Sequence, residues 1–265
     1  MPEKNIQVAL VPHDIAENDV DRNMQMLAQR FSDLRAGTDL IVLPELCFTG
    51  FCADRSIVEH IAEPNDGKCM EFVRQWSKRL DAAVCGGFLA RDSDGKLYNR
   101  GFVTTPDGST SFYDKRHLFA GAESVLFTKG MALPPVVEFR TWKLKMAICY
   151  DIRFPVWNRC VNFDYDALIV VANWPHSRSY SWRQLLIARA IENQTYIAAC
   201  DREGEDIYGA YERYESMTLD HWGNDISEGT DDGTIYSTFD ASKLTRDRER
   251  FTPWRDADRF QILID

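Results

Sequence analysis

The sequence predicts an α/β domain in which helices cover central sheets, and three observations lead to this fold class. Apolar runs with the length of buried strands alternate along the chain with segments of helical periodicity. Most of these runs lack a strict alternation of polar and apolar residues, which is typical of strands buried on both faces. No repeat, low-complexity tract or flexible linker interrupts the pattern, so we expect residues 1–265 to form a single domain.

The first half of the chain alternates strands with helices and then forms a hairpin. Helical spacing is clear between residues 18 and 35, where apolar side chains recur at Val20, Met24, Leu27, Phe31 and Leu34. A Pro-Asp-Gly turn at 106–108 separates two strand-like segments. The expected elements are a strand over 6–11, a helix over 18–35, a strand over 40–44, a helix over 69–80, a strand over 82–90 and hairpin strands over 98–105 and 111–114.

The second half repeats the strand-then-helix pattern and ends in shorter strands. The run 167–172 is the longest uninterrupted apolar stretch and has the length of a buried strand. Residues 221–224 have the composition of a turn, and charges of alternating sign over 245–250 are typical of a solvated helix. The expected elements are strands over 143–148, 167–172, 196–200, 207–211, 215–219 and 234–239, a short helix from about Pro155 and a longer helix over 181–192.

Composition and charge exclude several classes of function. Hydrophobic residues make up 45% of the chain, which is enough to bury a full core. A net charge of −10 argues against nucleic acid as the main partner, because binding of nucleic acid depends on neutralising phosphates. The polar segment 1–5 and the short apolar run 6–11 predict neither a signal peptide nor a membrane-spanning segment, so no membrane partner is expected.

The cysteines and histidines indicate reduced thiols and no metal site. The seven cysteines are odd in number and include no Cys-x-x-Cys pair, so reduced thiols in a cytoplasmic protein are the simplest account. Neither their spacing nor that of the five histidines matches a zinc site. A thiol redox protein is disfavoured because Cys160, the cysteine nearest to Cys149 in the chain, is expected in the core.

Three chemically active side chains, those of Glu45, Lys115 and Cys149, follow predicted strands. Each alone is ordinary: the acid could be a cap, the lysine could lie on the surface, and the cysteine could be an inert buried thiol. Together they could catalyse a nucleophilic reaction, because a carboxylate can take a thiol proton while an ammonium favours the thiolate and stabilises an oxyanion. Reactive groups gather at the carboxyl ends of strands in such folds, so we expect the three to meet.

The sequence around these three residues resembles the signature segments of the nitrilase superfamily, the carbon–nitrogen hydrolases. The segments are Leu43-Pro44-Glu45-Leu46, Asp114-Lys115-Arg116-His117-Leu118-Phe119 and Ile148-Cys149-Tyr150-Asp151-Ile152-Arg153-Phe154-Pro155. They occur in the order of that family, and the gaps of 70 and 34 residues between the three reactive positions are similar to its spacing. The resemblance extends over nearly the whole chain.

Further segments resemble the ω-amidase branch of that superfamily. They are Ala172-Asn173-Trp174-Pro175, Trp182, the run 188–194 and the segment 251–258. One segment departs from the branch, whose members tend to have Asn-Arg-Val-Gly after the last core strand. Here the sequence is Asp201-Arg202-Glu203-Gly204, which we expect to add acid near the mouth of the site.

The resemblance implies a four-layer α-β-β-α sandwich, in which two sheets pack face to face with helices outside. It implies a homodimer that pairs through helical faces, and no metal or organic cofactor. For the chemistry, it implies Cys149 as the nucleophile and Glu45 as the general base and acid. Lys115 and the backbone N–H of Tyr150 would then hold the developing oxyanion.

Several other residues have both a functional and a structural interpretation. Glu123, eight residues after Lys115, matches a glutamate of the branch that approaches the catalytic lysine and the substrate amide, or it is a surface acid on a loop. We interpret His117 as structural, with its ring nitrogens bonded to backbone near the Lys115 loop. Trp174 is either core or pocket wall, and Trp182 is assigned to the core.

The resemblance implies a small-molecule amide as the partner. The expected reaction cleaves the terminal amide of a small ω-amido dicarboxylic acid, such as α-ketoglutaramate or α-ketosuccinamate, through a thioester. In a chain of net charge −10 the substrate carboxylate needs a local cation, and Arg153 and Arg178 are the candidates, although each could be a surface arginine. Two alternatives stay open: hydrolysis of a nitrile or N-carbamoyl compound by the same residues, and a catalytically silent binding protein.

Overall fold

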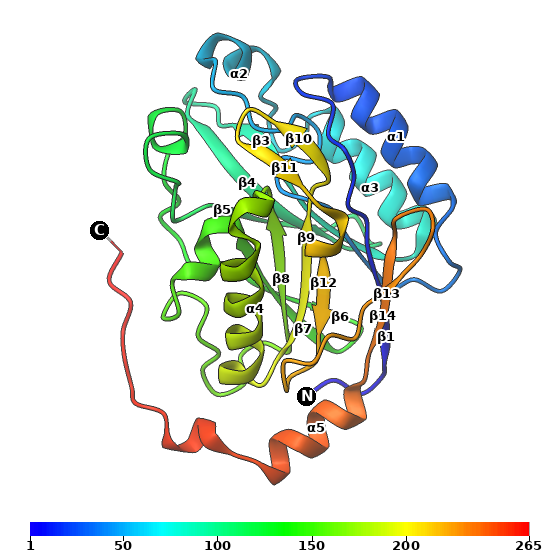
Figure 1. The fold of residues 1–265 in the computed structure, drawn as a ribbon, viewed down its shortest axis with the longest axis vertical. Coiled ribbons are helices and arrows are strands. Elements are labelled where there is room, and N and C mark those ends of the chain that lie inside the picture. Colours follow the sequence, from blue (N-terminus) through cyan, green and yellow to red (C-terminus); the bar gives the residue numbers. More distant parts are fainter. Residues whose placement is uncertain (265) are drawn as a thin grey trace.

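The computed structural model describes residues 1–264, and within them a seven-stranded and a five-stranded sheet pack face to face (Figure 1). In spatial order the larger sheet contains β13 (Glu228–Gly229), β14 (Ile235–Phe239), β1 (Ile6–Leu10), β2 (Leu40–Val42), β3 (Ala83–Arg91), β4 (Leu97–Thr104) and β5 (Thr110–Asp114). The smaller sheet contains β12 (Met217–Leu219), β9 (Tyr196–Asp201), β8 (Ala167–Ala172), β7 (Trp142–Ile148) and β6 (Val136–Phe139).

Helices and one small hairpin complete the described chain. The α-helices are α1 (Val20–Ser32), α2 (Arg55–Ile61), α3 (Lys68–Leu80), α4 (Ser179–Asn193) and α5 (Ala241–Arg250). The hairpin pairs β10 (Gly204–Asp206) with β11 (Gly209–Tyr211). None of the helices described is both long and apolar enough to cross a membrane.

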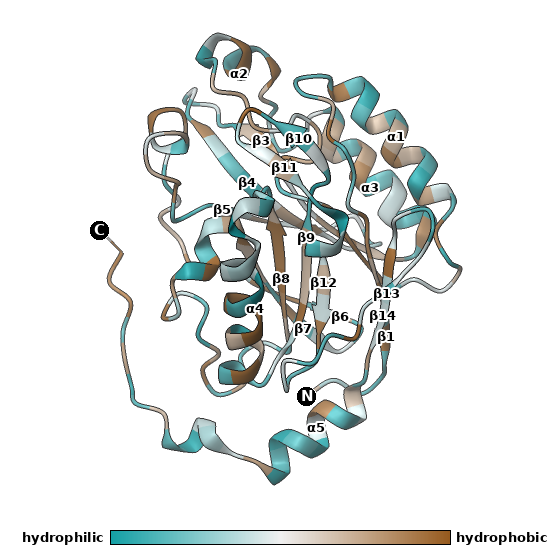
Figure 2. Cartoon of the chain, viewed as in Figure 1, coloured by the Kyte–Doolittle hydropathy of each residue, from teal (hydrophilic) through white to brown (hydrophobic). Residues whose placement is uncertain are grey.

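The two sheets share an apolar interface because their strands are apolar on both faces. Alternate residues of a strand point to opposite faces, so Val42 of β2 packs between the sheets while Ile41 packs against the outer helices. From the other sheet, Met146 of β7 and Ile169 of β8 enter the same central core. Figure 2 shows the resulting hydrophobic colour along β8 and β9, whereas α5 is mostly hydrophilic.

Helices cover the outer face of each sheet. On the larger sheet, Leu27 and Phe31 of α1 are fully buried in a cluster that also contains Val73 of α3. Each such side chain contributes about 1.5–3 kcal/mol through burial. On the smaller sheet, Trp182 and Leu186 of α4 pack against β8 and β9. The expected four-layer α-β-β-α sandwich is confirmed.

The predicted short helix from Pro155 is wrong, because the helical turn lies before that residue. A 3-10 helix occupies Cys149–Arg153, directly after β7. Phe154 precedes a proline, which disfavours helical backbone, and its φ of −107° and ψ of 93° are extended. Asn158 donates through Nδ2 to the carbonyls of Asp151 and Phe154, at 2.7 and 3.0 Å, and so supplies Asp151 with a donor where Pro155 has no N–H.

Two tail elements also differ from expectation. The strand predicted over 207–211 is instead the second half of the β10–β11 hairpin, and its turn is closed by Asp206, whose Oδ1 accepts the backbone N–H of Tyr208 at 2.7 Å. The strand predicted over 215–219 begins only at Met217, after a 3-10 helix. The solvated helix of the tail, α5, also buries one charge: Arg248 donates through Nη1 to Asp166 Oδ1 at 2.5 Å.

The parallel strands bring the reactive part of the sequence to one edge. Because β1, β2 and β3 are parallel and β7, β8 and β9 are parallel, the segments that follow β2, β7 and β8 leave their sheets at carboxyl ends. Glu45 follows β2, Cys149 follows β7 and Asn173 follows β8.

Candidate active site

Glu45 is held by backbone packing as well as by hydrogen bonds. Its side chain is almost fully buried, and the neighbouring Leu46 has a positive φ of 48°. Gly87 of β3 lies against this turn so closely that a Cβ there would be 3.0 Å from Leu46 N and 3.1 Å from Glu45 Cα. A glycine at position 87 therefore lets the strand support the turn that presents the carboxylate.

Lys115 joins two carboxylates in the interior. It follows β5, is only 2% exposed, and places Nζ 2.7 Å from Glu45 Oε1 and 2.8 Å from Glu123 Oε2. Asn99 of β4 donates through Nδ2 to Oε1 of both glutamates, at 2.6 and 2.7 Å. Burial alone would lower the pKa of Lys115, but the carboxylates of Glu123 and Glu45 outweigh burial and hold its pKa well above the ordinary value. Lys115 is therefore a fixed cation.

Glu123 is a buried partner of Lys115 and not a surface acid. It is 5% exposed at the start of a 3-10 helix, and its Oε2 accepts the backbone N–H of Phe119 at 2.7 Å. Burial raises the pKa of Glu123, while the ammonium of Lys115 opposes that shift. The structural alternative for this residue, an exposed loop acid, is wrong.

Cys149 occupies a strained turn at the end of β7. Its φ of 45° lies in the left-handed region, which non-glycine residues rarely adopt. The thiol donates to the carbonyl oxygen of Asn173, with the sulfur 3.9 Å away, and the backbone N–H of Asn173 donates to Glu45 Oε2 at 2.8 Å. Burial and the charge of Glu45 raise the pKa of Cys149 well above the ordinary value, despite the opposing charge of Lys115. The protonated thiol is therefore the resting form.

A buried aspartate connects the Cys149 turn to the Lys115 loop. Asp151 Oδ2 accepts hydrogen bonds from Ile148 N at 3.1 Å and from Tyr113 Oη at 2.8 Å. Its Oδ1 lies 2.7 Å from His117 Nδ1 and accepts the backbone N–H of the same histidine at 3.1 Å. The predicted backbone partner of the His117 ring is thus wrong, because Nδ1 of the ring bonds to the Asp151 carboxylate. The ring also stacks on Phe154, with 3.7 Å between the ring centroids.

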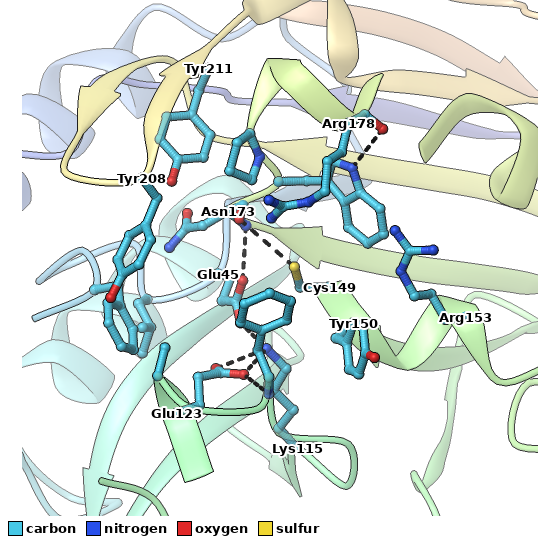
Figure 3. A pocket seen from close by; sticks show the side chains of 16 residues that line it. Glu45, Lys115, Glu123, Cys149, Tyr150, Arg153, Asn173, Arg178, Tyr208 and Tyr211 are labelled. Carbon is cyan, nitrogen blue, oxygen red and sulfur yellow. Dashed lines mark hydrogen bonds and ion pairs between the residues drawn. The ribbon is translucent and has the colours of Figure 1, made fainter. Parts of the chain in front are cut away.

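The three expected reactive residues line one cavity of about 370 Å³. Figure 3 shows Cys149 in the cavity wall, with Glu45 beside it and Lys115 and Glu123 below. The remaining wall is largely aromatic and aliphatic, and its members are Leu46, Phe51, Phe119, Ala122, Tyr150, Arg153, Asn173, Trp174, Pro175, Arg178, Tyr208 and Tyr211. Among residues 1–264, no cluster of three or more His, Cys, Asp or Glu side chains is placed to hold a metal ion.

Both candidate arginines reach this cavity, and Trp174 lies between them. The guanidinium carbons of Arg153 and Arg178 are 4.7 and 5.9 Å from the centroid of the Trp174 ring. Arg153 also donates to Ser181 Oγ at 3.2 Å. Within the described chain neither arginine has a carboxylate within 4.0 Å, so both cations are available to an anion in the cavity. Trp182, by contrast, is core: it is fully buried and donates to the Glu215 carbonyl.

The segment that departs from the ω-amidase pattern does not add acid at the cavity mouth. Asp201 is fully buried, and its Oδ1 accepts the backbone N–H groups of Trp174 and Arg202 at 2.8 and 2.9 Å. Arg202 is also buried and pairs with Asp206 at 3.2 Å, while Glu203 pairs with Arg213 at 2.8 Å. The expectation was wrong because these acids have local partners and none lines the cavity.

Sequence reasoning did not single out several residues of the site. Asn99 is a polar residue inside a buried strand, and Asn173 directly follows the most apolar strand, so both carried a usable signal. Tyr208 and Tyr211 come from the β10–β11 hairpin, whose position over the cavity no local pattern predicts (Figure 3). The buried Asp151 lies in the segment 148–155 that resembles a family signature, but no role was predicted for it.

Comparison with known proteins gives a consistent picture. The family model described as carbon-nitrogen hydrolase matches residues 7–249. The chain is similar to the protein named omega-amidase YafV of Escherichia coli (strain K12), with 34% identity over 261 residues, 97% of this chain and 98% of the relative. It is also similar to the 2-oxoglutaramate amidase of Bacillus subtilis (strain 168), with 29% identity over 221 residues, 82% of this chain and 84% of the relative.

Solved structures support the same fold. The chain superposes on XC1258 from Xanthomonas campestris, described as a CN-hydrolase superfamily protein with an arsenic adduct in the active site, with a TM-score of 0.91. The two are 32% identical, and the match covers 98% of this chain and all of the other. Nit3 from Saccharomyces cerevisiae, at 23% identity, shares the fold with a TM-score of 0.84, covering 95% of this chain and 96% of that one.

Proposed function

The chain belongs to the carbon–nitrogen hydrolase family, and we propose that it is an ω-amidase that releases ammonia from the terminal amide of a small dicarboxylic acid monoamide. The observation that carries this proposal is that one cavity contains both the buried Glu45–Lys115 pair, with Cys149 in the cavity wall, and two arginines that lack carboxylate partners among the described residues. The relatives named omega-amidase and 2-oxoglutaramate amidase support a carboxylate-bearing substrate. Short 2-oxo acid amides such as α-ketoglutaramate and α-ketosuccinamate are the favoured compounds.

The first half of the proposed reaction forms a thioester. Glu45 takes the proton of Cys149, whose raised pKa keeps the thiol protonated until a base assists. The sulfur attacks the amide carbon, and the oxyanion is held by the Lys115 ammonium and the backbone N–H of Tyr150. Glu45 then gives its proton to the departing nitrogen, so ammonia leaves and an acyl–sulfur bond remains.

The second half of the reaction hydrolyses the thioester. Glu45 takes a proton from water, and the resulting hydroxide attacks the same carbonyl carbon. The same two donors stabilise the second oxyanion, and Cys149 leaves as a thiol after it recovers the proton from Glu45. Glu123 keeps Lys115 in place and charged throughout, because its carboxylate lies 2.8 Å from the ammonium. Each cycle converts one amide and one water into one acid and one ammonia.

The arginines supply the proposed selectivity for an acid. A chain with a net charge of −10 repels anions at long range, so a substrate carboxylate needs local cations. Arg153 and Arg178 both line the cavity, and a planar guanidinium can bind a carboxylate through two hydrogen bonds. A neutral amide would leave these cations without a partner.

Hydrolysis of an ω-amido acid and of its neutral methyl ester at the distal carboxylate tests the proposal, with ammonia release as the readout. We expect a strong preference for the acid, which Arg153→Met or Arg178→Met should reduce by about 2–4 kcal/mol in kcat/KM for the arginine that contacts the carboxylate. Arg250→Met, at an exposed position at the end of α5, is the matched control and should leave the preference unchanged. Equal hydrolysis of acid and ester by the wild-type enzyme would overturn the ω-amidase assignment.

The two alternatives are measured by related experiments. Nitriles and N-carbamoyl amino acids belong in the same ammonia-release screen, and a higher kcat/KM for either would favour that substrate class. A catalytically silent binding protein would form no acyl adduct on Cys149, whereas the proposed enzyme forms a thioester that mass spectrometry detects after rapid acid quench.

The assembly and location of the protein are part of the same proposal. We propose a cytoplasmic homodimer of single-domain subunits that pair through helical faces. Tyr180 and Ile191 of α4 are 77% and 49% exposed, so this helix carries uncovered apolar surface. Light scattering of the purified protein should give twice the subunit mass of 30.5 kDa, and a single-subunit mass at micromolar concentration would contradict the dimer.

A further inference from the structure

The side chain of Asn173 has no hydrogen-bond partner in the described chain, although it borders the reactive groups. Both its Oδ1 and its Nδ2 are inaccessible to solvent, and neither bonds to another residue among residues 1–264. A buried amide that makes no hydrogen bonds is unfavourable, because it has lost its water without replacement. Native proteins tolerate such a group where a ligand completes it.

The backbone of Asn173 fixes where this side chain can act. Its N–H donates to Glu45 Oε2 at 2.8 Å, and its carbonyl accepts from the thiol of Cys149, with the sulfur 3.9 Å away. One residue thus contacts both the proposed base and the proposed nucleophile through its main chain. Figure 3 shows its side chain in the cavity, between these two groups and Tyr208.

The donors nearest the two glutamates are already committed, although Oδ1 of Asn99 is also without a partner among residues 1–264. Lys115 is shared between Glu45 and Glu123, and Asn99 donates to both of the same carboxylates. The carboxamide of Asn173 is therefore an uncommitted neighbour of the reacting bond that offers both a donor and an acceptor. Its acceptor can be satisfied only by a ligand that brings a hydrogen on nitrogen or oxygen.

We propose that Asn173 determines selectivity for a carboxamide over an ester, by accepting an N–H of the scissile amide through Oδ1 while Nδ2 donates to an oxygen of the same substrate. This inference rests on the proposed function. The scissile nitrogen is the only N–H group of a 2-oxo acid ω-amide, so it is the group that can complete Oδ1. An ester of the same acyl chain has no such hydrogen and leaves the acceptor unpaired.

The same bond would orient the leaving group. With one N–H held by Asn173 and the backbone of Asn173 bonded to Glu45, the lone pair of the tetrahedral nitrogen is directed toward the carboxyl that must protonate it. Loss of the side chain should therefore lower kcat as well as raise KM for amides. Ester cleavage, in which an alkoxide oxygen leaves, does not use this contact.

The test compares an ω-amide with the ω-methyl ester of the same acid, since both pass through the same thioester. Asn173→Leu keeps the branched shape and the number of side-chain heavy atoms and removes both hydrogen-bonding atoms, and Asn173→Ala provides a second, smaller replacement. We expect kcat/KM for the amide to fall by about tenfold or more, which corresponds to one lost hydrogen bond, while the value for the ester stays within about threefold. Lys115→Ala is the matched comparison: it removes an oxyanion donor that both substrates use and should lower both values together.

Each outcome is decisive for one of the two proposals. If both variants lose amide and ester hydrolysis in equal proportion, or lose neither, the selectivity role of Asn173 is overturned, and unchanged thermal melting excludes misfolding as the cause. If the wild-type enzyme ignores ω-amido acids but cleaves a neutral amide, the proposed substrate class fails. The amide-to-ester comparison then decides the role of Asn173 on that neutral amide. A wild-type protein that cleaves no amide overturns both.

Discussion

The Nδ1 atom of His117 lies 2.7 Å from Oδ1 of Asp151, so the loop that follows Lys115 is bonded to the turn that follows Cys149. The remaining bonds of this carboxylate reach Ile148 N and Tyr113 Oη, on β7 and β5. Those strands belong to different sheets. One buried acid therefore joins the segment that carries the proposed oxyanion donor Lys115 to the turn that carries the proposed nucleophile Cys149.

Asp151→Asn should disturb both stability and catalysis. The substitution leaves one acceptor oxygen and turns an NH₂ group toward at least one of the donors that now bond the carboxylate. A buried donor left unpaired costs about 1–3 kcal/mol, so urea unfolding should show a loss of about 2 kcal/mol or more. Asp94→Asn, at an exposed turn, is the control and should change stability by less than about 0.5 kcal/mol. Unaltered unfolding of Asp151→Asn would show that the link is dispensable.

Replacement of Cys149 should abolish turnover while the fold persists. Cys149→Ala removes the sulfur from a cavity wall, and Cys149→Ser offers a hydroxyl that is much harder to ionise beside a carboxylate. Ammonia release should therefore be undetectable for the first and nearly so for the second, with unchanged circular dichroism. Activity of Cys149→Ala within about tenfold of the wild-type value would refute the proposed nucleophile.

The roles proposed for Glu45 and Lys115 can be tested by the effect of each substitution on kcat. Glu45→Gln keeps size but removes the base, so kcat should fall by more than about a hundredfold. Lys115→Ala removes an oxyanion donor, worth about 3 kcal/mol, and also leaves Glu45 and Glu123 without their shared cation. Steady-state kinetics measure both effects. A change in KM alone for Lys115→Ala would assign the lysine to substrate binding.

Gly87→Ala should impair the site through the backbone. The added Cβ would lie 3.0 Å from Leu46 N and 3.1 Å from Glu45 Cα, and backbone atoms cannot move aside as a flexible side chain can. We expect Glu45 to shift, kcat/KM to fall by about tenfold, and stability to drop by about 1–3 kcal/mol. Gly229→Ala, which meets no atom within 4 Å, is the control and should leave both quantities unchanged.

A buried histidine should make the fold sensitive to acid. Burial lowers the pKa of His13 to about 4, although its ring nitrogens lie 3.3 and 3.0 Å from the carbonyls of Val11 and Cys47. The unfolded chain takes up this proton near pH 6.5 and the folded chain only near pH 4, so stability falls as pH drops between those values. Between pH 7 and pH 5 this group should cost about 2 kcal/mol.

Urea titrations at the two pH values measure this effect. The difference in the free energy of unfolding between pH 7 and pH 5 should be smaller by about 2 kcal/mol in His13→Gln than in the wild-type protein. His60→Gln, at an exposed position in α2, is the control and should retain the wild-type difference. An equal pH dependence in wild type and His13→Gln would contradict the prediction.

Sequence patterns predicted the helices and strands whose formation depends mainly on neighbouring residues in the chain. The strand over 167–172 was predicted to the residue, because a run of six apolar residues has the length of a buried strand. The helix predicted over 69–80 begins one residue earlier, at Lys68, and ends at Leu80 as predicted. The helix expected from Pro155 failed because Phe154, which precedes the proline, is extended, and the side chain of Asn158 bonds the carbonyls of Asp151 and Phe154 before it. The partner of His117 was missed for a related reason: the chain separates it from Asp151 by 34 residues, and only the packing of the two sheets joins them.

The residues of the site were likewise predicted where a local motif marks them and missed where distant packing places them. Glu45, Lys115 and Cys149 could be selected because each ends a predictable strand in a recognisable motif. Tyr208 could not, because it reaches the cavity from a hairpin whose placement depends on the whole tail. Asp201 was misplaced at the mouth because its sequence shows an acid, whereas its bonds to Trp174 and Arg202 lie in the interior.

At position 149 the backbone conformation favours glycine, whereas the proposed reaction needs the sulfur of a cysteine. A non-glycine residue at a φ of 45° costs about 1 kcal/mol or more, and glycine would relieve that cost. Selection for turnover should therefore remove Cys149→Gly, whereas stability alone gives no reason to keep a non-glycine residue at this left-handed position. In a related protein that no longer needs the reaction, we would expect Cys149→Gly to be tolerated. The residue at this position therefore distinguishes relatives under selection for turnover from relatives without it.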